Sequence, residues 1–376
     1  MDKIDLHIVS FNVPFPADYG GVIDVYYKLK ALSDLGIRVA LHCFDYGRGE
    51  QPKLNEVAAE VHYYPRDVNK LIAVFSSPFT VKSRISKELL VRLAADDAPI
   101  LFESLQSCLY LDHPSLADKR KWVRAHNVEH DYYRSLAKYE SAGVRKIYYL
   151  KEAVALEKFE SVLEHADGVL AISTKDTNYF KEIGLTAHYL PAFYNRFEFN
   201  EKAVIEIDEV ALYHGNLQVE ENVEAVLFLL EVFKELPFRL IIAGNKPGFS
   251  ISKAARALSN VQVMESPSDE QLFDLIHSSK LNCLPTFQAT GIKLKLLHAL
   301  CSGNQVLVNS EMLEGTDLGQ FCEMASSVQN WREVITQMMN NELDLSKIAN
   351  RREQVKALFN NQQNAMQLAE WLGLAQ

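Results

Sequence analysis

Short apolar segments alternate with longer amphipathic stretches along almost the whole chain. Short segments rich in β-branched residues predict buried strands, and apolar residues spaced three or four apart predict helices. Strands that alternate with helices favour parallel sheets with helices on both faces, because each connection must return to the same end of the sheet. In the first half, the predicted strands are residues 4–11, 37–44, 100–102, 122–125, 168–172 and 187–190, and the predicted helices are 21–35, 87–95 and 144–165.

A second series of alternating strands and helices begins near residue 210. Between the two series, residues 191–204 carry proline, asparagine and charges in place of a periodic pattern, as is typical of a hinge. We therefore predict an α/β chain of two Rossmann-like domains, residues 1–195 and 196–376, whose parallel sheets face a cleft between them. A terminal helix near 361–372 is expected to cross back to the first domain. The predicted strands of the second series are 210–213, 239–243, 261–264, 281–284 and 305–309, and its helices are 222–235, 269–278 and 292–301.

Composition and charge narrow the class of protein. The 376 residues fit two domains, and contents of 48% hydrophobic and 23% charged residues are those of a folded globular protein. The net charge is −10, with −2 over residues 1–200 and −8 over the remainder, so the chain is a poor candidate for binding nucleic acid. No apolar run is long enough to span a bilayer, and the N-terminus lacks a signal peptide's apolar stretch, which predicts a cytoplasmic protein. The five cysteines lie outside metal-ligand spacings and are expected to be reduced.

Two short basic clusters in the first half leave two interpretations open. Each cluster could be a solvated face of the domain. Alternatively, the clusters could attract the chain to an anionic membrane surface that carries a lipid-linked acceptor, which would make the protein peripheral to the inner face of the membrane. The clusters are Lys82, Arg84 and Lys87, and then Lys119, Arg120, Lys121 and Arg124.

The first domain has two candidate ligand-binding segments, each at the carboxyl end of a predicted strand. Gly20 and Gly21 follow the first strand and open a helix, so a phosphate could approach the backbone and meet the amides of the helix N-terminus. Their spacing is neither the dinucleotide-binding glycine pattern nor a Walker loop. His126 follows the strand 122–125, at the sheet edge where parallel α/β sheets bind ligands. The alternatives are a tight turn for the glycines and a structural role for the histidine.

The second domain concentrates its candidates in residues 285–303. A strand there gives way to Thr290 and Gly291, and then to a helix with Lys293 and Lys295 in its first turn. Lysines at a helix N-terminus oppose the helix dipole, so they are favourable there if an anion such as a diphosphate occupies the site; otherwise both point to water. Other strand ends join the same predicted rim and supply Gly215, Asn216, Gly244 and Glu265.

The order of these motifs resembles glycosyltransferase family 4, a large group of retaining transferases with the two-Rossmann fold called GT-B. The resemblance covers nearly the whole chain, and it rests on the joint order of the motifs more than on any one of them. They are residues 14–21 (PFPADYGG), 126–130 (HNVEH), 171–176 (AISTKD), 215–217 (GNL) with 222–225 (NVEA), 290–297 (TGIKLKLL) and 314–315 (EG).

The resemblance implies transfer of a hexose from a nucleoside-diphosphate sugar to a saccharide or lipid-linked acceptor, in cell-surface polysaccharide synthesis. It implies no cofactor and no required metal, and the chain has no Asp-x-Asp motif. Gly20 and Gly21 would close over the donor diphosphate, and His126 would face the transferred sugar. Lys293, with the amides around Gly291, would hold the diphosphate from the second domain. In such enzymes the leaving diphosphate is thought to take the acceptor's proton, so the protein orients the substrates and stabilises charge.

The sequence departs from the family pattern at the expected donor site. His298 stands where the family usually places a glutamate that holds the ribose hydroxyls, and Thr290 stands where many members place another glutamate. Gln218, Glu220 and Glu221 occupy a segment in which many members carry an arginine. A neutral imidazole makes one hydrogen bond where a carboxylate accepts two. Two alternatives therefore stay open: a catalytically silent binding or scaffold subunit, and a sugar-nucleotide epimerase.

Overall fold

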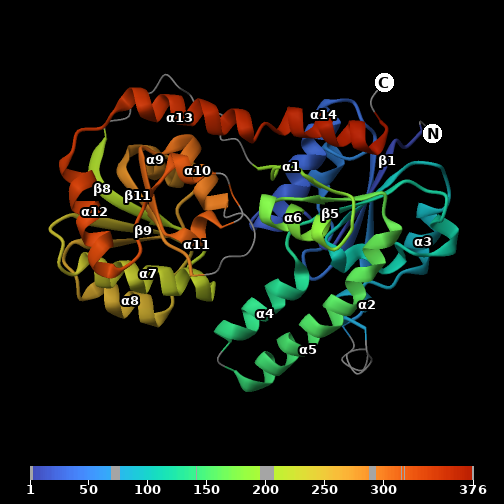
Figure 1. Cartoon of the computed structure of the whole chain (residues 1–376), viewed down its shortest axis with the longest axis horizontal. Helices are drawn as coiled ribbons and strands as arrows, with labels where there is room; N and C mark the ends of the chain where they lie inside the picture. Colours follow the sequence, from blue (N-terminus) through green and yellow to red (C-terminus); the bar gives the residue numbers. More distant parts are fainter. Residues whose placement is uncertain are drawn as a thin grey trace. The chain divides into compact units, whose positions relative to one another are not determined.

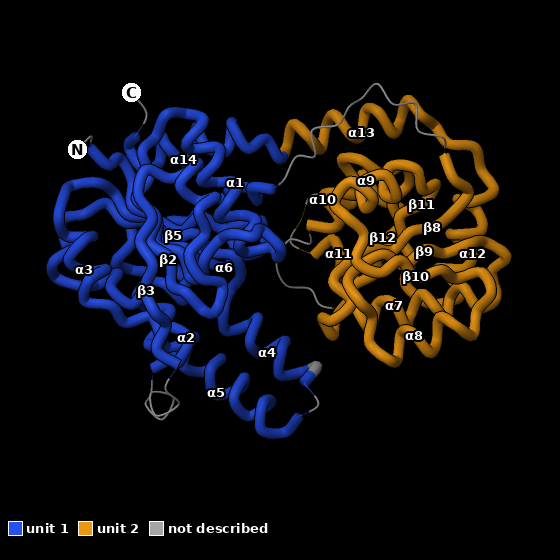
Figure 2. The backbone as a smooth tube through the Cα atoms, turned by 180° about the vertical axis from the view of Figure 1, so that it is seen from behind, with its two compact units in different colours: residues 1–195, 290–292, 359–376 blue, residues 196–289, 293–358 orange. Residues whose placement is uncertain are grey.

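The structure is a computed structural model that describes residues 3–68, 77–140, 142–194, 207–287, 294–314, 316 and 318–374. The chain divides into two compact units, coloured separately in Figure 2. The first unit contains Met1–Asn195 and also Phe359–Gln376 from the C-terminus. The second unit contains Arg196–Ala289 and Lys293–Leu358.

The first unit is built on a seven-stranded sheet in the order β3-β2-β1-β4-β5-β6-β7. Every pairing in it is parallel. The strand order reverses between β1 and β4, and ligands bind beyond the carboxyl ends of the strands at such a point in doubly wound sheets. The strands are β1 (Leu6–Ser10), β2 (Val39–Asp45), β3 (Glu60–Pro65), β4 (Ile100–Glu103), β5 (Lys121–Ala125), β6 (Gly168–Ala171) and β7 (Ala187–Tyr189).

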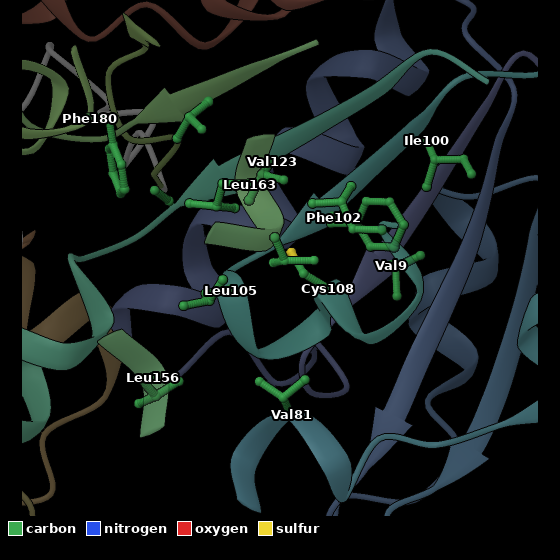
Figure 3. Close-up of a cluster of buried hydrophobic side chains, with 14 of the residues drawn as sticks. Val9, Val81, Ile100, Phe102, Leu105, Cys108, Val123, Leu156, Leu163 and Phe180 are labelled. Atoms are coloured by element: carbon green, nitrogen blue, oxygen red, sulfur yellow. The ribbon is translucent and has the colours of Figure 1, made fainter. Parts of the chain in front are cut away.

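Helices cover both faces of this sheet, and each face has its own hydrophobic core. Ile100 and Phe102 of β4 belong to the core drawn in Figure 3, whereas Leu101 between them belongs to the core on the other face. Leu368 of α14 packs in that second core, and α14 contacts α1, so the C-terminal helix belongs to the first unit. The helices are α1 (Gly20–Asp34), α2 (Phe79–Lys82), α3 (Lys87–Leu93), α4 (Glu129–Tyr139), α5 (Gly143–Phe159), α6 (Thr174–Glu182) and α14 (Asn361–Leu372).

The second unit repeats this plan with a six-stranded parallel sheet in the order β10-β9-β8-β11-β12-β13. Its strands are β8 (Asp208–His214), β9 (Arg239–Gly244), β10 (Val261–Glu265), β11 (Ser279–Leu284), β12 (Gln305–Val308) and β13 (Glu323–Met324). Its helices are α7 (Glu220–Phe233), α8 (Phe249–Arg256), α9 (Asp269–Ser278), α10 (Leu294–Ser302), α11 (Ser310–Leu313), α12 (Val328–Asn340) and α13 (Leu345–Leu358). The predicted α/β class with two parallel sheets is therefore confirmed.

The structure differs from the sequence prediction at a few elements. Strand β3 was not predicted, because Glu60 and His62 interrupt its apolar pattern at the exposed edge of the sheet. The helix predicted over 144–165 ends at Phe159, and a 3-10 segment, Glu160–His165, continues it. Most of the predicted hinge lies outside the described residues. Among the described helices, none is long and apolar enough to cross a membrane.

Candidate functional site

The first unit gathers charged side chains at the carboxyl ends of its central strands. Glu103 is the last residue of β4, and His126 directly follows β5, the next strand of the sheet. Helix α1 lies beside them and contributes Asp24 and Lys28, one turn apart on its buried face. Arg124 on β5 completes the set. We call Asp24, Lys28, Glu103, Arg124 and His126 the charged cluster.

Every charge in this cluster is paired. Lys28 Nζ lies 2.9 Å from Asp24 Oδ2 and 2.6 Å from Glu103 Oε1. The Arg124 guanidinium holds both oxygens of Asp24, with Nε 3.0 Å from Oδ2 and Nη2 2.8 Å from Oδ1. All five side chains are buried. Because two cations meet two carboxylates, the charges compensate one another inside the unit.

The cationic partners lower the pKa of both carboxyl groups. Burial alone would raise the pKa of Asp24, but the charges of Arg124 and Lys28 outweigh it and lower that pKa. For Glu103, the charge of Lys28 and the hydrogen bond from His126 lower the pKa against the effect of burial. Both groups are therefore ionised at neutral pH, and the cluster is a fixed electrostatic feature of the unit.

Glu103 also sets the orientation of the His126 ring. His126 Nε2 lies 3.0 Å from Glu103 Oε2, and since an ionised carboxylate only accepts hydrogen bonds, Nε2 carries the hydrogen. The ring of Phe11 meets the imidazole edge-on, with 5.5 Å between centroids. Nδ1 has no hydrogen-bond partner among the described residues. In the neutral imidazole this Nδ1 is an acceptor, and it is the atom of His126 available to a ligand.

The turn that follows Glu103 is strained. Ser104 has φ 66°, a region that residues other than glycine seldom occupy. Its hydroxyl donates to Glu129 Oε1 over 2.6 Å, and the other carboxylate oxygen of Glu129 accepts from the Gln106 side chain. Glu129 is the first residue of α4, in the loop–helix segment that contains His126. The strained turn therefore ties the end of β4 to the loop after β5.

Asp24, Glu103 and His126 bring possible metal-ligand atoms within 4.8 Å of one another. However, all four carboxylate oxygens already accept hydrogen bonds from the two cations, the imidazole and the Phe193 amide. A metal ion would have to displace Lys28 and Arg124, whose positive charges oppose it. The donor set does not fit a metal.

The structure corrects the interpretation of three members of the basic clusters, Arg84, Lys121 and Arg124, as surface residues. Arg124 is fully buried in the charged cluster. Arg84 is also buried, and its guanidinium donates to the carbonyl of Phe11. Lys121 donates to the carbonyl of Leu111 from a buried position. These cations have internal partners, so neither solvation nor attraction to a membrane explains them.

In the second unit, two strand ends approach each other closely. Gly215 follows β8, and Gly244 ends the neighbouring strand β9. A Cβ atom on Gly244 would overlap the carbonyl oxygen of Gly215, so only glycine fits there. The loop is fixed further by Asn245 Oδ1, which accepts from the Leu217 amide over 2.7 Å. At the end of β10, the Ser266 amide donates to the Gly244 carbonyl. Backbone thus lines this edge of the sheet.

Lys295 lies beneath this loop. Its Nζ donates to Asn222 Oδ1 over 2.8 Å and lies 5.1 Å from the centre of the Tyr213 ring. The amide of the Asn222 side chain in turn donates to the Asn216 carbonyl over 3.0 Å. The interpretation that Lys295 points to water is therefore wrong, since the residue connects α10 to the loop after β8. Its predicted contact with a diphosphate stays a prediction.

His298 lies one turn further along α10 and influences His214 at the end of β8. Burial lowers the pKa of His298 to about 4. The pKa of His214 is lowered to about 3, by burial and by the charges of His298 and Lys295. Both imidazoles are therefore neutral at pH 7 and can each offer one donor and one acceptor.

The structure places the remaining predicted residues as follows. Gly20 is the first residue of α1. Gly21 packs against the Phe11 ring, since a Cβ on Gly21 would lie only 2.7 Å from Phe11 Cζ. The same Phe11 ring contacts His126. Glu265 ends β10 and is exposed. Thr290, Gly291 and Lys293 lie outside the described residues.

Sequence reasoning selected His126 but missed the other four members of the charged cluster. A signal for them exists in the sequence. Asp24 and Lys28 are spaced i, i+4 on the apolar face of the predicted helix 21–35, and Arg124 stands inside an apolar strand. Charged residues in apolar elements are seldom buried unless they are paired.

Replacing Gly244 with alanine is expected to destabilise the second unit. The new methyl group must push the Gly215 backbone away, and overpacking of this kind costs ~1–3 kcal/mol. Gly215→Ala is the matched control, because its Cβ would meet its nearest atoms, on Asn222 and Tyr213, at 3.4 Å, an ordinary contact. Denaturant unfolding monitored by circular dichroism measures both variants. Equal stability of the two would contradict the close approach of the two strand ends.

Comparison with known proteins supports the fold. No family model matches the chain. A 44.6 kDa protein from the cps region of Klebsiella pneumoniae, described as uncharacterized, is 28% identical over 333 residues, which cover 82% of this chain and 84% of that protein.

The structure of HepE from Anabaena, in complex with UDP and glucose, matches with a TM-score of 0.65 and 13% identity, over 99% of this chain and 100% of HepE. WaaB, a lipopolysaccharide outer core galactosyltransferase, matches with a TM-score of 0.64 and 15% identity, over 96% of this chain and 99% of WaaB. The chain has the GT-B fold.

Proposed function

We propose that the chain is a glycosyltransferase that moves a hexose from a nucleoside-diphosphate sugar to a saccharide or lipid-linked acceptor, with retention and without a metal. The GT-B fold and the likeness to WaaB and HepE support the reaction class. The relative in the cps region of Klebsiella pneumoniae supports a role in cell-surface polysaccharide synthesis. These matches extend over both units of the chain, so the likeness is to a two-unit fold and not to one domain of it.

The observation that carries the proposal is the backbone-lined edge of the second sheet. Gly215 and Gly244 present peptide groups where side chains would otherwise stand, so a nucleotide can approach the strand ends closely. Neutral His298 and His214 lie next to this edge and suit hydroxyl groups better than phosphates. In this proposal the second unit binds the donor, Lys293 and the amides near Gly291 hold its diphosphate, and His298 meets the ribose.

The first unit then supplies the face that meets the transferred sugar. His126 Nδ1 accepts a hydrogen bond from a sugar hydroxyl, and Glu103 fixes the ring for that contact. Gly20 and Gly21 offer amides of the α1 N-terminus to the diphosphate. The leaving diphosphate takes the proton of the acceptor hydroxyl, so no protein nucleophile is needed. The residues named here orient the substrates and stabilise the charge that develops on the phosphate.

Calorimetric titration with UDP and GDP tests this proposal. We expect one nucleotide to bind the wild type and Lys293→Ala to weaken that binding by ~1–3 kcal/mol, the scale of a charge-assisted hydrogen bond. His298→Glu is expected to tighten binding by ~1 kcal/mol, because a carboxylate accepts from both ribose hydroxyls. Lys234→Ala is the control, since this exposed lysine pairs with Glu231 on the surface.

A silent binding subunit is the second candidate, and His298 favours it, because the chain lacks a carboxylate at that position. Flat titrations of both the wild type and His298→Glu would assign the chain to this class and overturn the enzymatic proposal. An epimerase is less well supported, since Thr290 and His298 occupy the positions where it needs carboxylates near the sugar. Incubation with UDP- and GDP-sugars distinguishes the enzymes, because an epimerase converts a sugar nucleotide without an acceptor.

A further inference from the structure

Helix α5 carries a row of apolar side chains on its solvent side. Val144, Ile147, Leu150 and Val154 are exposed to 85%, 56%, 46% and 49%. Their spacing of three or four residues places them along one face of the helix. Leu156 of the same helix is fully buried in the core of the unit, so a different face attaches α5 to the protein. The exposed row is not needed to hold the helix in place.

The helix is fixed from its inner side. The Glu152 carboxylate accepts from the amides of Phe79 and Thr80 over 3.0 and 2.8 Å and from the Thr80 hydroxyl over 2.7 Å. Helix α4 lies alongside α5, and Arg134 of α4 bonds Glu157 over 2.7 Å. Figures 1 and 2 show the α4–α5 pair at the edge of the first unit, beyond the end of its sheet. The apolar row is therefore presented on a preformed helix.

Basic side chains accompany the apolar row. Lys151 and Lys158 follow Ile147 at spacings of four and eleven residues, so they share its face, and Lys146 is exposed nearby. The two acidic residues of the helix are engaged elsewhere, Glu152 in the interior and Glu157 with α4. The outer face of α5 is thus apolar and cationic, although the whole chain has a net charge of −10.

We propose that this outer face of α5 binds an anionic membrane surface. The apolar side chains enter the boundary between headgroups and acyl chains, and the lysines meet lipid phosphates, as in other interfacial helices. A second copy of the chain fits this face less well, because a twofold contact would bring lysines against lysines. The proposal rests on α5 alone, and it does not depend on the donor chemistry proposed above.

Vesicle co-sedimentation of the full chain tests the proposal. We expect binding to vesicles of phosphatidylcholine with phosphatidylglycerol, little binding to phosphatidylcholine alone, and weaker binding at high salt. Lys151→Gln with Lys158→Gln should weaken binding about fivefold for each lysine removed. Ile147→Ser with Leu150→Ser should also weaken it, because the apolar contribution is lost. Val91→Ser with Lys53→Gln is the matched control, since these residues are exposed on other elements of the same unit.

The outcomes separate the possible occupants of the face. Equal sedimentation of the wild type and both α5 variants, or no binding to anionic vesicles, overturns the proposal. Binding to phosphatidylcholine alone that is insensitive to salt overturns the cationic part of it. Wild-type dimerisation that Ile147→Ser with Leu150→Ser abolishes, without vesicle binding, assigns the face to a second copy. Unchanged circular dichroism of the variants shows that each result reflects binding and not unfolding.

Discussion

Replacing Asp24 with alanine is expected to destabilise the first unit by ~3–5 kcal/mol, because it leaves a buried guanidinium without its carboxylate. Asp24 accepts two hydrogen bonds from Arg124, one from Lys28 and one from the Phe193 amide. Arg124 would keep only carbonyl partners, at Leu190 and Pro191. Denaturant unfolding followed by circular dichroism measures the loss.

The same helix provides the matched control for this prediction. Asp34 pairs with Lys30 at the same i, i+4 spacing on α1, but both side chains are about half exposed, and the distance is 3.7 Å. Exposed pairs of this kind contribute ~0.3–0.5 kcal/mol, so Asp34→Ala should be nearly neutral. If Asp24→Ala and Asp34→Ala lose similar amounts of unfolding free energy, the buried pairing of Asp24 does not stabilise the first unit as described.

Replacing His126 with alanine is expected to lower the turnover of sugar transfer by ~100- to 1000-fold, the usual effect of removing one positioned hydrogen-bonding group from an active site. This prediction rests on the proposed function. The imidazole contacts Glu103 through Nε2, and only Nδ1 is available to a ligand. Steady-state transfer with the donor found by calorimetry measures the effect, and His165→Ala, at an exposed position, is the control.

A second readout separates a role in catalysis from a role in folding. If His126 meets the sugar, His126→Ala should still bind the nucleotide with the wild-type dissociation constant, since the proposed nucleotide contacts are made by the second unit and by the backbone amides of Gly20 and Gly21, not by the His126 side chain. If His126 has only a structural role, replacing it should instead lower the free energy of unfolding and leave the turnover of the folded fraction unchanged. Wild-type turnover by a stable variant would exclude His126 from the reaction.

The fold could be predicted because its signals are local. Strands such as 100–102 and 281–284 are short apolar runs between turn residues, and their alternation with amphipathic helices is visible without any long-range contact. Both were found as strands of parallel sheets. Strand β3 was not predicted, because an edge strand is only partly buried and its sequence need not be apolar. Periodicity reports burial, and it becomes weak where burial is partial.

Parts of the candidate site could also be predicted from position along the chain. A residue that follows a predicted strand must lie at the carboxyl edge of a parallel sheet, which is why His126, Gly215 and Gly244 were selected correctly as edge residues. Their roles toward a ligand stay predictions. What the sequence does not show is that Gly244 faces Gly215, since the two belong to different strands and meet only through the sheet register.

The sequence by itself determined the elements, the class of fold and the residues at the strand ends, because these depend on neighbours within a few positions. Only the tertiary structure decided the partners of the charges. Arg124 belongs to a run of basic residues in the sequence, yet it meets Asp24, a hundred positions away, in the interior. In the sequence, the lysines of α5 look no different from Arg124, but in the structure they lie at the surface. The cost of burying a charge depends on what surrounds it in space, and spatial neighbours far apart in the chain leave no periodic signal.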